Sequence, residues 1–289
     1  MERIRIGWDL TKKAWSVVRS NPGLLKLPIF GGLLALLFLS VIGTPAILLV
    51  AGDEPSQAAQ ITAGALGLLA MYLASFSVIF FNVALAASAN QAFNGNSADT
   101  SFGIAVARSR LGVIAAWALV AGLVSLFFAF LRDRGGLAGQ IAAGLGGAIW
   151  SLITFLVIPV LAFEGIGPLA AIKRSAGLFR QRWGQQITGN AAIGIITFMF
   201  MLLGVAMIVG GVFAGAAGGA LIALGVGLAV GGVVVLVAAA VVSGAVRGVF
   251  GVALYHYVAE NQLAGPFTQA DLESVVKVKG GGAAAGGTI

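Results

Sequence analysis

The sequence predicts an all-α membrane protein in which six transmembrane helices form three hairpins, each preceded by a basic amphipathic helix at the membrane interface. Hydrophobic residues make up 59% of the 289 residues and charged residues only 9%, with a mean hydropathy of +1.02. A soluble domain carries about 25% charged residues, so this composition indicates a membrane-embedded chain. The apolar residues gather in long uncharged runs: Leu27–Gly52, Pro55–Ala98, Leu111–Leu131, Gly135–Phe163 and Ile187–Val246.

The lengths of these runs determine the number of spans. A transmembrane helix needs about 20 apolar residues, so each of the first four runs holds one span. The last run is long enough for two spans with a turn near Gly215–Gly219. We therefore expect one domain over residues 1–279, followed by a disordered Gly/Ala-rich tail at 280–289. The expected spans cover about residues 27–51, 63–92, 111–131, 140–163, 187–212 and 221–246.

Glycines are abundant and regularly spaced in the fifth and sixth spans. Gly211, Gly215 and Gly219 follow one another at intervals of four, and Gly227 and Gly231 repeat the spacing. Small residues allow the backbones of membrane helices to approach closely. We interpret the pattern as close packing within one chain; a contact face between subunits and a pore-lining seam are the alternatives.

Lysine and arginine are distributed unevenly between the two ends of the predicted hairpins. All of them except Arg132 and Arg134 precede residue 27, follow residue 246 or lie within 108–110 and 173–182. Six alternating spans place these segments on one side of the membrane, and the positive-inside rule makes that side cytoplasmic. We expect a multi-pass protein of the cell membrane with both termini in the cytoplasm. The net charge of +7 then attracts the anionic inner leaflet and indicates no nucleic-acid partner.

Two segments are predicted to be amphipathic helices lying in the plane of the membrane interface. Within residues 3–20 one face consists of Ile4, Trp8, Thr11, Trp15 and Val18. Within residues 168–183 the apolar stripe consists of Leu169, Ile172, Ala176, Phe179 and Trp183. Basic helices with such a face bind the bilayer surface; a solvated helix docked on the spans is the alternative for residues 3–20. The expected lipid contacts are Trp8, Lys12, Lys13, Trp15, Arg19, Lys173, Arg174, Arg180, Arg182 and Trp183.

The chain also contains a weak internal repeat of a basic segment followed by a two-span hairpin. Val83-Ala84-Leu85 with Asn90-Gln91 is similar to Val252-Ala253-Leu254 with Asn261-Gln262, although the spacing differs by one residue. We expect three copies of this unit.

A set of motifs resembles a known family. It comprises Gly7-Trp8, Ala14-Trp15, Asn21-Pro22, Leu27-Pro28, Pro159, Glu164-Gly165, Ala171-Ile172-Lys173-Arg174-Ser175, Arg182-Trp183-Gly184, Leu254-Tyr255 and Tyr257. These residues resemble an uncharacterised family of six-span prokaryotic membrane proteins, the domain-of-unknown-function family 6159. A looser likeness extends to the membrane domain that accompanies some glycerophosphodiester phosphodiesterases. The resemblance implies a fold and no activity.

The sequence holds no recognisable catalytic or metal-binding constellation. None of the ten carboxylates lies at mid-span, where ion-coupled transporters usually carry an ionisable group. One histidine and no cysteine cannot build the usual zinc site, and no serine has histidine and aspartate partners in triad roles. We therefore expect neither an enzyme nor a cofactor.

Asn82, Pro159, Glu164 and His256 are the candidates for a cavity or a hinge. Glu164 follows the fourth span and precedes a Gly-x-Gly-Pro sequence. An ion pair or helix-cap contact with Lys173, Arg174 or a neighbouring repeat is one interpretation, and a polar wall of a cytoplasm-facing cavity is the other. Asn82 lies inside the second span, where it makes a contact between helices or touches a ligand.

Two functions fit this pattern. The first is a membrane-organising protein that binds lipid or a partner, with its basic helices on the anionic inner leaflet. The second is a transporter or channel for a lipid or small molecule through the helix bundle. The charge placement favours the first, and the glycine-rich last hairpin leaves room for the second. The expected partners are membrane lipids, with a second copy of the chain or another membrane protein as alternatives.

Overall fold

The computed structural model describes residues 2–183, 191–216, 221–269 and 271–272. These ranges are helical apart from short connections, and they contain no strand. Two π-helical turns are denoted η. The elements in chain order are α1 (Glu2–Ser20), α2 (Gly23–Phe38), η1 (Leu39–Gly43), α3 (Thr44–Leu48), α4 (Gln57–Phe93), α5 (Thr100–Ser109), α6 (Leu111–Arg134), α7 (Gly136–Ile153), α8 (Val157–Phe163), α9 (Pro168–Trp183), α10 (Ala191–Ala216), α11 (Leu221–Tyr255) and η2 (His256–Glu260).

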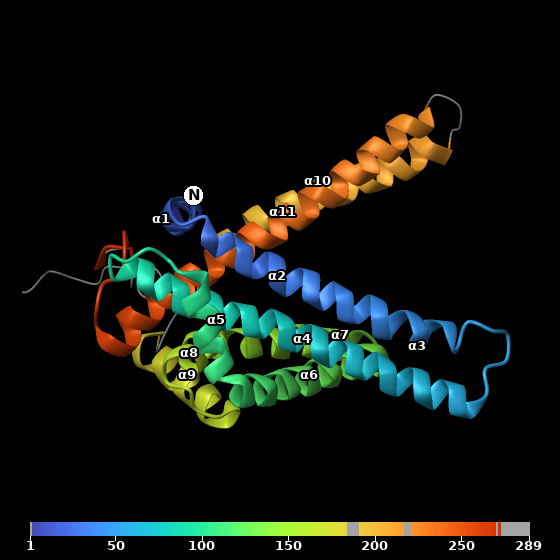
Figure 1. Ribbon diagram of the computed structural model, residues 1–289, viewed down its shortest axis with the longest axis horizontal. Coiled ribbons are helices and arrows are strands. Elements are labelled where there is room, and N and C mark those ends of the chain that lie inside the picture. Colours follow the sequence, from blue (N-terminus) through green and yellow to red (C-terminus); the bar gives the residue numbers. More distant parts are fainter. Residues whose placement is uncertain (1, 184–190, 217–220, 270, 273–289) are drawn as a thin grey trace, which may run out of the picture.

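Six helical stretches in the described ranges are long and apolar enough to cross a membrane. Consecutive stretches pair as hairpins: α2–α3 packs along α4, α6 packs along α7, and α10 packs along α11 (Figure 1). The shorter helices α1, α5 and α9 precede the three hairpins in turn. The predicted fold class is confirmed. The stretches extend over Gly23–Leu48, Gln57–Phe93, Leu111–Arg134, Gly136–Phe163, Thr197–Ala216 and Leu221–Glu260.

The buried core lies at one end of the hairpins. There α1, α5, α8 and α9 gather around the last turns of α4 and α11 (Figure 1). Val83–Leu85 of α4 and Val252–Leu254 of α11, the two fragments that suggested a repeat, are both fully buried in this core. The far halves of the hairpins instead carry exposed large side chains such as Leu36, Phe127 and Phe213. Hydrocarbon tails cover such a surface, because they are as apolar as the side chains themselves.

The hairpin of α10 and α11 diverges from the other two. It leans away from α2 and α4, so that the bundle opens into a V from its core end outward (Figure 1). Near the core end, α11 still packs against α2, α4 and α8, and α1 packs on both α10 and α11. The vertex of the V therefore lies beside the amphipathic helix α1.

Glycine backbones make the contact between α10 and α11. A Cβ at Gly225 would lie 2.5 Å from the carbonyl oxygen of Gly211, and one at Gly232 would lie 2.6 Å from that of Gly204. No side chain larger than hydrogen fits at these crossings. Gly227, which the sequence pattern grouped with Gly231, has open space around it. The packing interpretation is therefore supported at Gly211, which the regular spacing included, while Gly225, Gly232 and Gly204 lie outside that spacing.

Candidate functional site

The fourth span is interrupted where it enters the core. Helix α7 ends at Ile153 and α8 begins at Val157, so the span expected over residues 140–163 contains a break. Ser175, a buried residue of α9, donates to the carbonyl of Ile153 at 2.5 Å and accepts from the N–H of Leu156 at 3.2 Å. Backbone groups left without partners in a buried site cost free energy. Ser175 satisfies two of those that the break releases.

Glu164 lies at the end of α8 and contacts two other elements. Its Oε1 accepts from Nε of Arg174 in α9 at 2.9 Å and from the hydroxyl of Tyr255 in α11 at 2.8 Å. The hydrogen bond to Glu164 raises the pKa of Arg174 above its usual value, which keeps the guanidinium charged. The structure thus contains the ion pair with Arg174 that the sequence suggested. It adds Tyr255, which the sequence did not indicate.

Gly165 follows in a left-handed conformation, with φ of 62°. A Cβ at this position would collide with the guanidinium of Arg110, which lies between α5 and α6. Glycine is favoured by this dihedral angle, and it also lets the Arg110 guanidinium lie close to the backbone. Within the described residues, Nε of Arg110 is buried without a hydrogen-bond partner. Arg110 packs the second repeat unit against the start of the third.

His256 joins the end of α11 to the end of α4. Its Nδ1 lies 2.6 Å from Oε2 of Glu260, and its Nε2 lies 2.8 Å from Oδ1 of Asn90. Pro159 is buried in α8 beside Gly251 of α11. His256 is half-buried, and both candidates lie where helices of different units meet.

Helix α1 uses one face to dock and leaves another exposed. Leu10, Ala14 and Val17 are buried against the bundle, whereas Trp8 and Trp15 are 45% and 36% exposed. Of the predicted apolar face, Val18 is fully buried in the core, so that face coincides only in part with the docking face. The cations of α1 differ in their surroundings. Lys12 lies 5.4 Å from the ring centroid of Trp8 and 3.9 Å from Asp9, Lys13 pairs with Asp271, and Arg19 is exposed.

Helix α9 shows the same division. It docks through Ala171, Ser175 and Leu178, and Leu169 of the predicted apolar stripe is 71% exposed. Lys173 and Arg180 are exposed as well. The side chains of Arg182 and Trp183 lie outside the described part of the structure, as do residues 187–190 of the expected fifth span and the tail 280–289.

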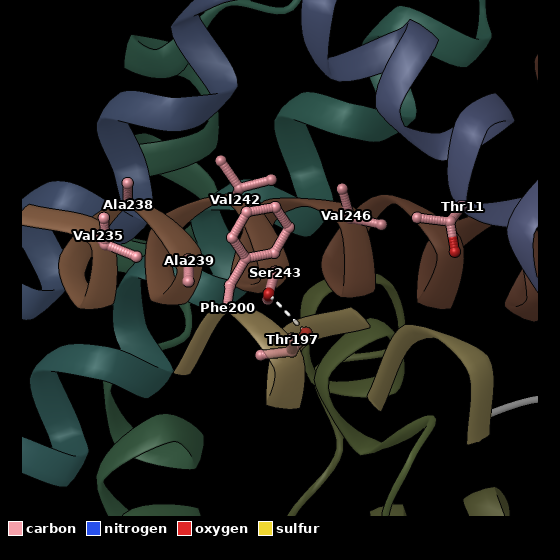
Figure 2. Close-up of a pocket in the computed structure, with 9 residues that line it drawn as sticks. All are labelled: Thr11, Thr197, Phe200, Val235, Ala238, Ala239, Val242, Ser243 and Val246. Carbon is pink, nitrogen blue, oxygen red and sulfur yellow. Dashed lines mark hydrogen bonds between the residues drawn. The ribbon is translucent and has the colours of Figure 1, made fainter. Parts of the chain in front are cut away.

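Two cavities lie on opposite faces of the same stretch of α11. The first, here called the α1 cavity, has a volume of about 270 Å³ and lies between α1, α10 and α11 (Figure 2). A hydrogen bond of 2.7 Å joins the hydroxyls of Thr197 in α10 and Ser243 in α11 in its wall. The cavity is lined by Thr11, Thr197, Phe200, Val235, Ala238, Ala239, Val242, Ser243 and Val246.

The second, the Asn82 cavity, has a volume of about 440 Å³ and lies between α2, α4 and α11 in the V. Asn82 of α4 lines it together with Pro28 and Gly31 of α2 and Gly244 of α11. Its remaining walls are aliphatic. Of the four candidates for a cavity or a hinge, Asn82 lines one of these two cavities, whereas Glu164 is engaged by Arg174 and Tyr255.

Comparison with known families identifies the chain at the level of family. Residues 62–265, more than half of the chain, match the family of unknown function DUF6159. The chain belongs to the DUF6159 family. No curated protein matches it, and no solved structure matches it. The matched DUF6159 region contains the junction from Pro159 to Trp183, both cavity faces of α11 and Leu254–Tyr257, while α1 and its motif Gly7–Pro28 precede it.

Sequence reasoning missed several residues of this DUF6159 chain that the structure brings together. The motifs contain Ser175 and Tyr255 but do not indicate their hydrogen bonds, and the position of Arg110 does not indicate its contact with Gly165. Thr197 and Ser243 could have been singled out, because hydroxyls in otherwise apolar spans commonly form hydrogen bonds between helices. Their hydrogen bond to each other becomes clear only when α10 and α11 are known to form one hairpin.

Proposed function

We propose that this DUF6159 protein is a lipid-binding integral membrane protein that binds the anionic cytoplasmic leaflet through α1 and α9. The observation that carries the proposal is the pair of exposed indoles on α1. Trp8 and Trp15 remain outside the core although Leu10 and Ala14, on the neighbouring face of the same helix, are buried. Docking on the bundle accounts for the buried face of α1, but not for a second, aromatic face beside its cations.

The physical chemistry of the interface supports this proposal. Tryptophan is enriched at the level of the lipid head groups, where its ring is partly buried and its N–H remains solvated. Each lysine or arginine near an anionic surface contributes about 1 kcal/mol of attraction. Lys12 and Arg19 are exposed beside the two indoles. Leu169 with Lys173 and Arg180 offers an equivalent arrangement on α9.

The placement of charges along the hairpins supports a cytoplasmic location for both termini. The elements at the core end, α1, α5 and α9, contain most of the cations, and Arg247 lies toward the same end of α11 (Figure 1). At the opposite ends lie Arg132 and Arg134 of α6 and the acidic turn Asp53-Glu54. By the positive-inside rule, the core end faces the cytoplasm.

The proposal is tested with a fluorophore on α1. The chain has no cysteine, so Ser16→Cys, at an exposed position of α1, provides one labelling site. In phosphatidylcholine nanodiscs the label reports a wet environment, and added phosphatidylglycerol should shift its emission to the blue. Removing two cations with Lys12→Gln and Arg19→Gln should weaken this insertion roughly thirtyfold, the effect of losing about 2 kcal/mol.

The matched control removes two cations from the other end, with Arg132→Gln and Arg134→Gln. This variant should respond to phosphatidylglycerol like the parent protein. An emission that does not depend on phosphatidylglycerol, or an equal loss in both double variants, would contradict binding of the anionic leaflet by α1.

Transport of a lipid or small molecule through the bundle is the second candidate, and the Asn82 cavity favours it. This cavity places a side-chain amide in an aliphatic wall beside α2, α4 and α11. Proteoliposomes containing fluorescent phospholipid test this function directly. Transport predicts that lipid crosses the bilayer faster than in protein-free vesicles and that Asn82→Leu removes the difference; equal rates with and without protein reject it.

A further inference from the structure

The α1 cavity has the lining of a hydrocarbon site. Six of its lining residues are aliphatic or aromatic, and three carry hydroxyls: Thr11, Thr197 and Ser243. None of the described residues that line it is ionisable. Its volume of about 270 Å³ is near the lower limit of about 300 Å³ for small-molecule sites. A single flexible apolar chain fits these properties better than a polar ligand does.

The cavity communicates with the surface that faces lipid. Phe200, which lies over Val242 and the hydroxyl pair in Figure 2, is 52% exposed, and Ala238 is exposed as well. The neighbouring residues Phe198 and Met199 of α10 are also exposed. Since this part of the hairpin belongs to two membrane-length helices, its surroundings are hydrocarbon. A lipid tail enters the cavity without crossing water.

A positive charge lies at the end of the cavity that is nearer the head groups. Arg247 of α11 is exposed, follows Val246 of the cavity wall and lies one helical turn beyond Ser243 toward the core end. None of the ion pairs among the described residues includes Arg247. Lys12 follows Thr11 of the wall on α1. Attraction between these cations and a phosphate complements the apolar wall below them.

We propose that the α1 cavity binds one acyl chain of an anionic glycerophospholipid, with the phosphate of the lipid beside Arg247. The lipid comes from the leaflet on which α1 lies, so this inference rests on the proposed function and adds a specific site to it. Helix α1 covers the cavity through Thr11, and the bound tail runs along α11 away from the core. The site distinguishes lipids by the charge of the head group, and it requires an acyl chain that can enter the cavity.

Photocrosslinking tests this site in the full-length protein. The probe is phosphatidylglycerol with a diazirine in one acyl chain, diluted into phosphatidylcholine vesicles that contain the reconstituted protein. Labelling should concentrate on peptides containing Thr197, Phe200 or Val235–Val246. Ala239→Trp, which fills the cavity, should remove this labelling. Ala223→Trp, at an exposed position of α11 outside the cavity, should leave it unchanged.

Arg247→Gln tests the head-group part at an exposed position, where the substitution does not disturb the core. It should lower the preference of the site for phosphatidylglycerol over phosphatidylcholine carrying the same diazirine about fivefold, the factor that about 1 kcal/mol gives, and Arg247→Lys should retain it. Labelling spread evenly over exposed α10 and α11, equal labelling in Ala239→Trp and Ala223→Trp, or an unchanged preference in Arg247→Gln overturns the site. The fluorophore on Ser16→Cys measures the binding of α1 to the leaflet independently of the cavity, because Ala239→Trp leaves the Lys12 and Arg19 side chains in place.

Discussion

Replacement of Ser175 by alanine should destabilise the protein through the break in the fourth span. The hydroxyl of Ser175 bonds the carbonyl of Ile153 and the N–H of Leu156, and both Ser175 and Leu156 are buried. Removing it leaves a buried donor and a half-buried acceptor without this partner, at about 1–3 kcal/mol for the donor and somewhat less for the acceptor. We therefore expect the free energy of unfolding to fall by about 2–4 kcal/mol.

Ser125→Ala is the matched control for this measurement. Ser125 is an exposed residue of α6 whose hydroxyl bonds the carbonyl of Ala121 in its own helix at 2.8 Å. Loss of such a local bond leaves the helical ladder intact, so the change should stay within about 0.5 kcal/mol. Denaturant titration of both variants in mixed micelles, followed by circular dichroism, gives the two free energies. A loss below about 1 kcal/mol for Ser175→Ala, or an equal loss for Ser125→Ala, would refute this role.

Three further predictions concern tertiary contacts. Glu164→Ala should lower the free energy of unfolding by about 2 kcal/mol, chiefly because the buried hydroxyl of Tyr255 loses its charged acceptor. Glu164→Gln should lower it by about half as much, since its amide oxygen still accepts. In a Tyr255→Phe background the effects of these two substitutions should differ less. Gly225→Ala should separate α10 from α11 and lower the thermal midpoint, whereas Gly227→Ala, in open space, should not. Burial opposes ionisation of Asp271, but hydrogen bonds from Lys13 and Thr268 outweigh it and hold the pKa of Asp271 below its usual value. The pair with Lys13 is therefore present above about pH 4 and lost as the pH falls further. Lys13→Gln should thus lower the free energy of unfolding by about 1 kcal/mol near pH 7, and by progressively less as the pH falls below about 4, in chemical denaturation. A cost independent of pH would contradict the last of these.

The six membrane-length helices could be predicted because the length of an apolar run depends on no tertiary contact. The same holds for the order of amphipathic helices and hairpins, which follows from where the cations interrupt the apolar runs. The docking faces of α1 and α9 were not predictable in this way. Ala14 and Ala171 carry much of the docking, and alanine contributes little to a hydrophobic pattern. The bulky residues of the two stripes dominate the periodicity, but Trp8, Trp15 and Leu169 are exposed.

The break in the fourth span illustrates a second limit. Pro159 is a local signal for a kink, because it cannot donate to the carbonyl of Phe155 one turn earlier. The sequence does not show what stabilises the opened backbone, since the hydroxyl comes from Ser175 in the following helix. Likewise, the approach of the Arg110 guanidinium to Gly165 is not visible in the sequence. Contacts of this kind become visible only when the packing of the units is known.

The junction from α8 to α9 and the surface of α1 differ in how their conspicuous residues are used. At the junction, Glu164, Gly165 and Ser175 each contact another part of the same chain. Glu164 forms an ion pair with Arg174, Gly165 lies close to Arg110, and Ser175 bonds the backbone at the break in the fourth span. Within the described structure, no contact of this kind explains the exposure of Trp8 and Trp15 or the presence of the α1 cavity. Folding needs the first group, and it gains nothing from exposing indoles or from leaving an apolar cavity beside them. The motifs at the junction therefore reflect architecture, and the less conspicuous region around α1 and α11 is where we propose that a lipid binds.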